Sequence, residues 1–268
     1  MSAHPTMTFL DNIVSAKHTE IGRAKTRVPQ PQLERLAAAR RDHRDFAASL
    51  NRPGIRIIAE LKRASPSLGD IHPHLDPSAL ALAYADGGAA ALSVLTEPAF
   101  FKGSADDLQR ARASVPLPVL RKDFILDPYQ VYETAAMGAD AMLLIVRILD
   151  DERLHALYAL AQRLELAVLV EVFDAQDAAR ACALGAPLVG INNRDLAHFK
   201  TDITHATHLA SHLPPETSVV ALSGIRTSGD IAENLRGGVR RFLIGEALVR
   251  QPDPVSTLRE WTAIHVTA

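Results

Sequence analysis

Eight short runs rich in Val, Ile and Leu recur along the chain, separated by segments of helical character. The runs begin about 20 to 35 residues apart, which is the length of one strand plus one crossover helix. Each run is almost continuously apolar, as expected of a strand covered on both faces. The predicted strands are Ile55 to Arg63, Ala90 to Thr96, Pro118 to Ile125, Ala141 to Val146, Ala167 to Val172, Leu188 to Asn193, Ser218 to Gly224 and Arg241 to Ala247.

The intervening segments carry the start and stop signals of helices. An aspartate opens each of three predicted helices, and a glycine follows the end of each. These helices are Pro77 to Tyr84, Asp127 to Met137 and Asp174 to Leu184. Eight strand and helix alternations favour the α/β class and a single closed (β/α)8 TIM barrel. An open doubly wound sheet is the alternative, but the chain has neither the G-x-G-x-x-G nor the G-x-x-x-x-G-K-[ST] turn.

About 50 residues precede the first predicted strand. Apolar residues recur there at helical spacing from Phe9 to Ile21, and a second helix is predicted from about Gln32 to Leu50. Nothing between this region and Ile55 resembles a long linker. We therefore expect one domain over residues 1–268, in which about residues 1–50 form an N-terminal helical extension packed against the barrel.

Composition excludes several classes of partner. The 29 Lys and Arg residues nearly balance the 31 Asp and Glu residues, so no broad basic field is available for a nucleic acid. No stretch approaches the roughly 18 apolar residues that span a bilayer, and no secretory signal is evident. The single cysteine, Cys182, rules out an internal disulfide and favours a reducing compartment. We expect a cytoplasmic protein without a metal site, since His205, His208 and His212 suit a solvated helix face.

Polar side chains stand late in five of the predicted strands. Alternate residues of a barrel strand face the lumen, so Glu60 and Lys62 share one inward face at the end of the first strand. Lys122 and Phe124 do so in the third strand, and Glu171 faces inward in the fifth. Charges inside a barrel are costly unless they are paired or functional, and the C-terminal strand ends are where such barrels carry catalytic groups.

Further polar residues follow the later strands. Asn192 and Arg194 share a face after the sixth strand, and Ser223 ends the seventh. A structural ion pair is the alternative for Glu60 and Lys62 alone, but five polar strand ends at one opening indicate a site. Arg121 and Asp123 have the opposite parity and are expected to contact the surrounding helices.

Two glycines suggest a phosphate-binding site. Gly224 follows the seventh strand and Gly245 ends the eighth, where backbone N–H groups can converge. Loops after strands seven and eight commonly form a phosphate site in this architecture. The pattern therefore predicts a small phosphorylated substrate.

Several motifs resemble those of the indole-3-glycerol phosphate synthase family of tryptophan biosynthesis. The resemblance spans essentially the whole chain, and the order of the motifs makes it specific. They are IAELKRASPS at 58–67, LSVLTE at 92–97, FKGS at 101–104, LRKDFI at 120–125, LVEV at 169–172, GINNRDL at 190–196 and SGI at 223–225.

The resemblance implies a cofactor-free carboxy-lyase. It would convert 1-(2-carboxyphenylamino)-1-deoxyribulose 5-phosphate into indole-3-glycerol phosphate, carbon dioxide and water. Lys122 would be the general acid, and Lys62 would hold the substrate carboxylate. The division of acid and base roles among Glu60, Lys62 and Glu171 is left open. The implied catalytic residues are Glu60, Lys62, Lys122, Glu171, Asn192 and Ser223, and the implied substrate-binding residues are Ser65, Phe101, Phe124, Leu143 and Arg194.

The implied phosphate-binding residues are Gly224, Gly245 and Glu246. Some relatives carry serine where this chain has Glu246, so its backbone N–H would bind while its carboxylate turns away. Two other functions are disfavoured. A phosphoribosyl isomerase would depend on an Asp or Cys pair at the strand ends, and a binding-only barrel would have lost Lys62 and Lys122. The chain is expected to be a monomer or a weak homodimer.

Overall fold

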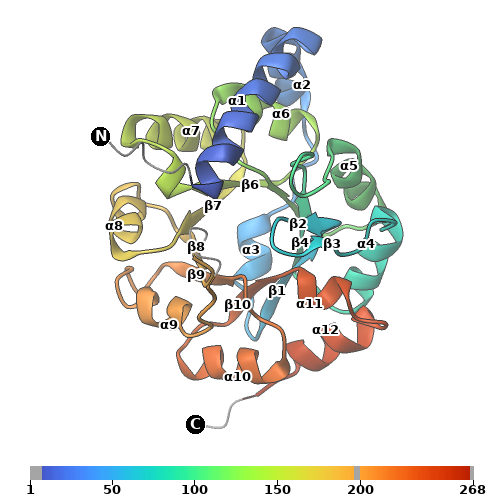
Figure 1. The fold of residues 1–268 in the computed structure, drawn as a ribbon, viewed down its shortest axis with the longest axis vertical. Coiled ribbons are helices and arrows are strands. Elements are labelled where there is room, and N and C mark those ends of the chain that lie inside the picture. Colours follow the sequence, from blue (N-terminus) through green and yellow to red (C-terminus); the bar gives the residue numbers. More distant parts are fainter. Residues whose placement is uncertain (1–7, 196–199, 266–268) are drawn as a thin grey trace, which may run out of the picture.

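Eight parallel strands close into a barrel in the computed structural model, which describes residues 8–195 and 200–265. The first strand pairs with both the second and the last strand of the ring, so the barrel has no free edge. Figure 1 looks down the barrel, with the helices around the ring of strands. The barrel strands are β1 (Arg56–Leu61), β4 (Ala91–Leu95), β5 (Val119–Lys122), β6 (Ala141–Ile145), β7 (Ala167–Val172), β8 (Leu188–Asn192), β9 (Ser218–Leu222) and β10 (Arg241–Ile244).

Helices follow the strands and cover them from outside. Asp76, Asp127 and Asp174 cap three of them by accepting hydrogen bonds from first-turn N–H groups, as predicted. The prediction of a closed barrel is thus confirmed over an open sheet. The outer elements are α4 (Pro77–Asp86), α5 (Ala105–Ser114), α6 (Pro128–Ala136), η1 (Val146–Ile148), α7 (Asp151–Arg163), α8 (Ala175–Ala183), α9 (His205–Ala210), α10 (Ser228–Arg236), α11 (Glu246–Val249) and α12 (Pro254–Thr262).

Three helices precede the barrel, namely α1 (Phe9–Arg27), α2 (Gln30–Ala39) and α3 (Phe46–Leu50). The prediction of one helix from Gln32 to Leu50 is wrong, because residues 40–45 leave the helical conformation. Arg40 and the backbone N–H of Arg44 both bind the buried carboxylate of Asp140, at 2.5 and 3.0 Å. In a continuous helix the N–H of Arg44 would donate to the carbonyl of Arg40, so the irregular segment frees this N–H to bind Asp140.

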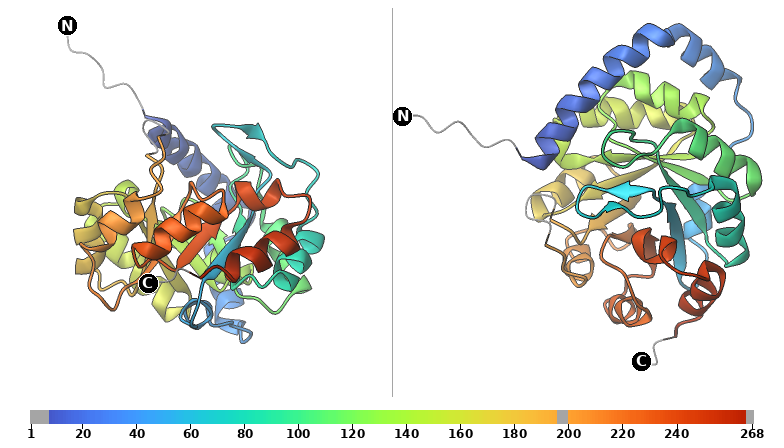
Figure 2. Two further views of the ribbon diagram at one scale, coloured as in Figure 1. Left: turned by 90° about the horizontal axis from the view of Figure 1, so that it is seen from below. Right: turned by 45° about the vertical axis from the view of Figure 1, so that its right-hand side comes forward.

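The hydrophobic core has two layers. One lies between the strands and the outer helices, and the other fills the lumen. In the lumen, Phe46 and Leu50 of α3 pack with Ile58, Leu120 and Leu143 from the strands. Figure 2 (left) shows α3 at one end of the barrel and the small β2 (Ala64–Ser65) and β3 (Gly69–Asp70) hairpin at the other. The end that α3 closes is the start of the strands, so only their C-terminal end is open.

Within the described residues, no helix is long and apolar enough to cross a membrane. The same part of the chain contains no group of three His, Cys, Asp or Glu side chains arranged to hold a metal ion.

Candidate active site

A pocket of about 1090 Å³, part of it open to solvent, occupies the C-terminal end of the barrel. We call this end the barrel mouth. Every side chain or glycine named as a site residue from the sequence lines this one pocket. They are Glu60, Lys62, Ser65, Phe101, Lys122, Phe124, Leu143, Glu171, Asn192, Arg194, Ser223, Gly224, Gly245 and Glu246.

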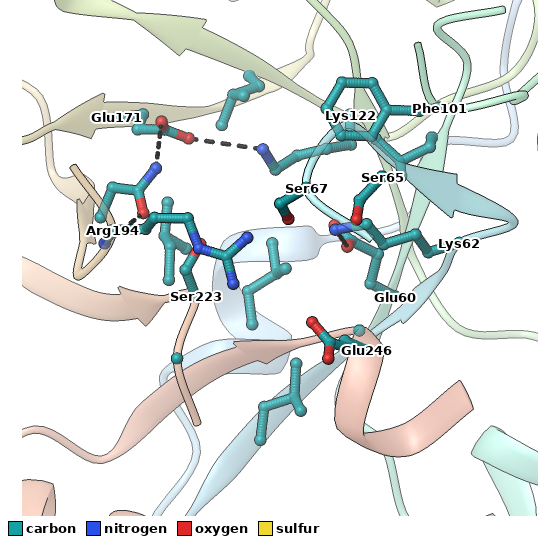
Figure 3. Close-up of a pocket in the computed structure, with 18 of the residues that line it drawn as sticks. Glu60, Lys62, Ser65, Ser67, Phe101, Lys122, Glu171, Arg194, Ser223 and Glu246 are labelled. Carbon is teal, nitrogen blue, oxygen red and sulfur yellow. Dashed lines mark hydrogen bonds and ion pairs between the residues drawn. The ribbon is translucent and has the colours of Figure 1, made fainter. Parts of the chain in front are cut away.

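One wall of the pocket carries a lysine and a carboxylate that face each other. The Nζ of Lys122, at the end of β5, lies 3.5 Å from Oε2 of Glu171 in β7 (Figure 3). Asn192, at the end of β8, donates from Nδ2 to the other carboxylate oxygen of Glu171 at 2.9 Å. The Oδ1 atom of Asn192 in turn accepts the backbone N–H of Arg194 at 3.0 Å. Glu171 is therefore held in place from one side and presents its second oxygen to Lys122.

The opposite wall carries a second pair, on and just after β1. The Nζ of Lys62 lies 3.7 Å from Oε1 of Glu60, and Ser93 of β4 donates to Oε2 of Glu60 at 3.3 Å. Burial lowers the pKa of Lys62 below the usual value of a lysine. The carboxylate of Glu60 opposes this shift, while the positive charge of Lys122 reinforces it.

Aromatic rings line the pocket between the two walls. The ring of Phe101 lies 6.1 Å from that of Phe124, centre to centre, and Lys62 places its ammonium group 5.6 Å from the centre of the Phe101 ring. Leu143 of β6 is buried below them. Phe9, at the start of α1, also lines the pocket. An apolar slot of this kind suits a flat aromatic group flanked by polar anchors.

The third side of the pocket is formed by the backbone after β9 and β10. Ser223 adopts a left-handed conformation with φ 64°, and Gly224 follows with φ 84°. Such a conformation is costly for serine and is characteristic of functional loops. A Cβ atom on Gly245 would lie 2.5 Å from Oε1 of Glu60, so only glycine leaves room for that carboxylate.

Glu246 lines the same side. The expectation that its carboxylate turns away is not met, because the side chain faces the pocket in Figure 3. Its charge is also one of those that raise the pKa of Lys62, and Oε1 lies 3.9 Å from Nε of Arg250 one turn later. The reason is the position of Glu246 at the first residue of α11, directly beside the opening.

Ser65 lies in the β2 and β3 hairpin that projects over the mouth. It is buried, and among the described residues its Oγ has no hydrogen-bond partner. A buried hydroxyl without a partner is uncommon and points to a group that binds it. Arg194 is half-buried and pairs with Thr201 in an isolated bridge beside the pocket.

The residues of opposite parity face outward, as predicted. The guanidinium of Arg121 contacts α6 through Glu133 at 2.7 Å, and the carboxylate of Asp123 contacts Lys17 of α1 at 2.8 Å.

Several residues in or beside the pocket escaped the sequence analysis, and Ser93, Glu97 and Phe9 illustrate the reasons. Ser93 has lumen parity in its strand and could have been found by the same rule as Glu60. Glu97 accepts hydrogen bonds from the N–H groups of residues 99, 100 and 101, and it thereby shapes the loop that carries Phe101. Phe9 has no such signal, because only the packing of α1 brings it to the mouth.

Comparisons with known proteins add evidence of a different kind to the geometry of the pocket. Residues 10–261 match the family model described as indole-3-glycerol phosphate synthase. A protein of that name from Desulfosudis oleivorans is 50% identical over 94% of this chain and 97% of its own length. Another from Albidiferax ferrireducens is 47% identical over the same shares of the two chains.

Solved structures of lower identity share the fold alone. A thiamine phosphate pyrophosphorylase from Pyrococcus furiosus has a TM-score of 0.57 at 16% identity, covering 77% of this chain and 93% of its own. A mandelate oxidase has a TM-score of 0.58 at 19% identity, covering 77% of this chain and 70% of its own.

Proposed function

The chain belongs to the indole-3-glycerol phosphate synthase family and catalyses the ring closure of tryptophan biosynthesis, and from that premise we propose how its residues divide the work. The reaction forms one carbon–carbon bond and releases carbon dioxide and water. It involves no net oxidation, so acid and base groups suffice for its steps. The proposal rests on one observation, namely that two pairs, each of a lysine and a carboxylate, face each other across one pocket.

Lys122 is the acid of the first step in this proposal. The aromatic carbon that bears the carboxylate attacks the substrate ketone, and the ketone oxygen takes a proton from the Lys122 ammonium group. Loss of carbon dioxide then restores the aromatic ring. The support is the position of Lys122 at the pocket, with its Nζ 3.5 Å from the carboxylate of Glu171, a group that can exchange a proton with it.

Lys62 and Glu171 act in the second step. The new hydroxyl group leaves as water with a proton from Lys62, while Glu171 removes a proton from the carbon next to nitrogen, which completes the indole. The lowered pKa of Lys62 supports this role, because an ammonium group that releases its proton more readily is a better acid near neutral pH. Glu60 orients Lys62, and Ser93 orients Glu60.

Binding groups surround these residues. We propose that Phe101, Phe124 and Leu143 hold the aromatic ring, with Asn192 and Arg194 on the sugar hydroxyl groups. Backbone N–H groups at Gly224, Gly245 and Glu246 bind the phosphate, with Ser223 beside it, and the Glu246 carboxylate then swings out of the pocket toward Arg250, 3.9 Å away. Ser65 binds the substrate from the hairpin. This arrangement is supported by the left-handed turn after β9 and by the buried, unpaired hydroxyl of Ser65 in the described structure.

We further propose that residues 1–268 form one domain that acts as a monomer or weak homodimer in the cytoplasm. The support for one domain is the closed ring of eight strands, in which the first strand pairs with the last. The lone cysteine suits a reducing compartment. Sedimentation at several protein concentrations measures the oligomeric state.

The substitution Lys122→Met tests the proposed mechanism. We expect kcat to fall by about two to four powers of ten, the usual worth of a general acid, while substrate still binds. The fluorescence of the indole product gives the rate, and isothermal titration of the variant gives substrate affinity. Lys102→Met is the control, because Lys102 is an exposed lysine outside the pocket lining. A Lys122→Met enzyme with near-normal kcat would remove Lys122 from the reaction.

A further inference from the structure

A buried lysine lies outside the groups that the reaction uses. Lys17 belongs to α1, in the N-terminal extension, and its side chain is only 1% exposed. Lysine is almost never fully buried unless it is paired, because an ammonium group loses its hydration there. We therefore expect Lys17 to have charged partners that compensate for the lost hydration of its ammonium group.

Two carboxylates provide the pairing. The Nζ of Lys17 lies 2.8 Å from Oδ1 of Asp123 and 2.7 Å from Oε2 of Glu20, which is one turn further along α1. Burial would lower the pKa of Lys17, but the two carboxylates outweigh it and raise that pKa. Lys17 is thus a fixed positive charge between the extension and the barrel.

Asp123 occupies the position directly between the proposed general acid Lys122 and the aromatic slot residue Phe124. Its carboxylate is completely buried and saturated with donors. Oδ1 also accepts the backbone N–H of Phe124 at 2.8 Å. Oδ2 accepts from the hydroxyl of Thr96 at 2.6 Å and from the guanidinium of Arg121 at 3.0 Å. The backbone that carries Lys122 and Phe124 is therefore fixed through this carboxylate.

Lys17 is one of several contacts that hold α1 on the barrel. The hydroxyl of Tyr129 shares its proton between two carbonyl oxygens at the end of α1, those of Ala24 and Val28, each 3.0 Å away. Lys25, also on α1, forms an ion pair with Asp127 at 2.9 Å, and Ile13 and Ile21 are buried. Lys17 is distinguished by its partner, which lies next to Lys122. Lys25 contacts only the start of α6 among the described residues, through the cap residue Asp127 and the ring of Tyr129.

We propose that Lys17 is a positioning residue for the ring-closing reaction, acting from the N-terminal extension through Asp123 to hold Lys122 and Phe124 at the barrel mouth. The ammonium group balances a buried carboxylate whose oxygens fix the end of β5. Catalytic groups need placement to within a fraction of an ångström, so a loosened strand end lowers the rate even when the fold is intact. This inference rests on the proposed role of Lys122.

The test is a double-mutant cycle with Lys17→Met, Asp123→Asn and the double variant, and with Lys25→Met as a matched control. Methionine keeps the apolar stem of lysine and removes the charge. We expect Lys17→Met to lower kcat by about 10- to 100-fold while KM changes by less than about threefold. Lys25→Met breaks the other ion pair between α1 and the barrel and is expected to leave both constants within about twofold of the parent enzyme.

The double variant distinguishes an effect of Lys17 that acts through Asp123 from two effects that are independent of each other. If Lys17 acts through Asp123, each single variant loses the same interaction, and the double variant is no slower than the slower single variant. Thermal unfolding of every variant confirms that the assay temperature lies below its transition. If Lys17→Met alone does not fold, the double variant, which leaves no unpaired carboxylate at position 123, replaces it and is expected to show the same loss of kcat.

Three outcomes would overturn the inference. These are a kcat of Lys17→Met within about threefold of the parent enzyme, equal losses in Lys17→Met and Lys25→Met, and losses that multiply in the double variant. If Lys17→Met does not fold and the double variant is measured in its place, a double variant with the kcat of the parent enzyme also overturns the inference. Failure of the proposed mechanism is recognised separately, because it appears as activity in Lys122→Met. An inactive Lys122→Met with a fully active Lys17→Met refutes the inference alone.

Discussion

The ammonium group of Lys62 lies in a site that favours the neutral amine. Burial lowers its pKa, the nearby cations Lys122 and Arg194 act in the same direction, and Glu60 opposes them. For an acid that must give up a proton near neutral pH, a lowered pKa is useful as long as the group stays protonated. Glu60 opposes the lowering of the Lys62 pKa, which gives the buried carboxylate beside it a role.

Replacement of Glu60 by glutamine has a predictable effect on pH dependence. The protonated form of Lys62 is the active one, so activity falls as the pH rises through its pKa. Since Glu60 raises that pKa, Glu60→Gln lowers it further and moves the alkaline limb of kcat/KM to lower pH. Values of kcat/KM for the parent enzyme and the variant, measured from pH 6 to 10, give the shift. An alkaline limb that stays in place or moves upward would contradict the role given to Glu60.

At the scale of elements, the loop after β4 shows how a buried carboxylate shapes a binding wall. Glu97 is 1% exposed and accepts three backbone N–H groups at 2.7 to 3.0 Å. Lys102 takes a left-handed conformation with φ 55°, and a Cβ atom on Gly103 would lie only 2.1 Å from the carbonyl oxygen of Leu95. The loop is therefore closely constrained, and it presents Phe101 to both Lys62 and Phe124.

We expect Glu97→Ala to lower kcat/KM by about 10- to 100-fold, because the loop loses three hydrogen bonds to one carboxylate. Each such bond contributes about 1.5–3 kcal/mol, and we expect only part of that loss to reach the transition state. Glu97→Gln keeps a carbonyl oxygen and should recover part of the activity. Lys102→Met again serves as the control, since the ion pair of Lys102 with Asp70 is about half exposed on both sides. Steady-state kinetics measure all three. Equal activity in Glu97→Ala and Lys102→Met would show that the loop does not need its carboxylate.

For the whole molecule, the two ends of the barrel have different tasks. The mouth carries the pocket, while the other end is closed by α3 (Figure 2). A charge cluster around Asp140, the residue before β6, lies at the start of the strands. The carboxylate of Asp140 is fully buried and accepts from Arg40 at 2.5 Å, from Arg112 at 3.3 Å and from the backbone N–H of Val119 at 3.0 Å. It joins the extension to α5 and β5, and it lies before β6, far from the catalytic strand ends.

Asp140→Ala should therefore affect stability and leave catalysis intact. Breaking a buried ion pair from one side typically costs about 3–5 kcal/mol, since the remaining guanidinium groups are left without their counter-charge. Urea denaturation measures the free energy of unfolding, and kcat per folded molecule is expected to stay within about threefold of the parent value. Asp86→Ala, which removes an exposed ion pair with Arg259, is the control and should cost less than about 1 kcal/mol. A tenfold loss of kcat in Asp140→Ala would contradict this separation of the two ends.

Patterns of local sequence determined the strands, most of the helices and the side of each strand that faces the lumen. They did so because the side chains of a strand alternate with a period of two and because helices begin and end at recognisable cap residues. The alternation alone was enough to place Glu60, Lys62, Lys122 and Glu171 at one opening of the barrel. The break after Ala39 was missed, because it depends on Asp140, which lies 100 residues away. A local pattern does not contain an interaction over that separation.

Only the tertiary structure decided which charges pair with which. Parity assigned Asp123 to the outer face but could not indicate that Lys17 of the extension would meet it there, or that Ser93 and Glu97 would hold the groups around the pocket. Hydrophobic periodicity specifies which face of a helix or strand is buried, but the same periodicity is compatible with many different packing partners. The partner of a buried charge is set by distances of about 3 Å between atoms, and these exist only once the elements are packed.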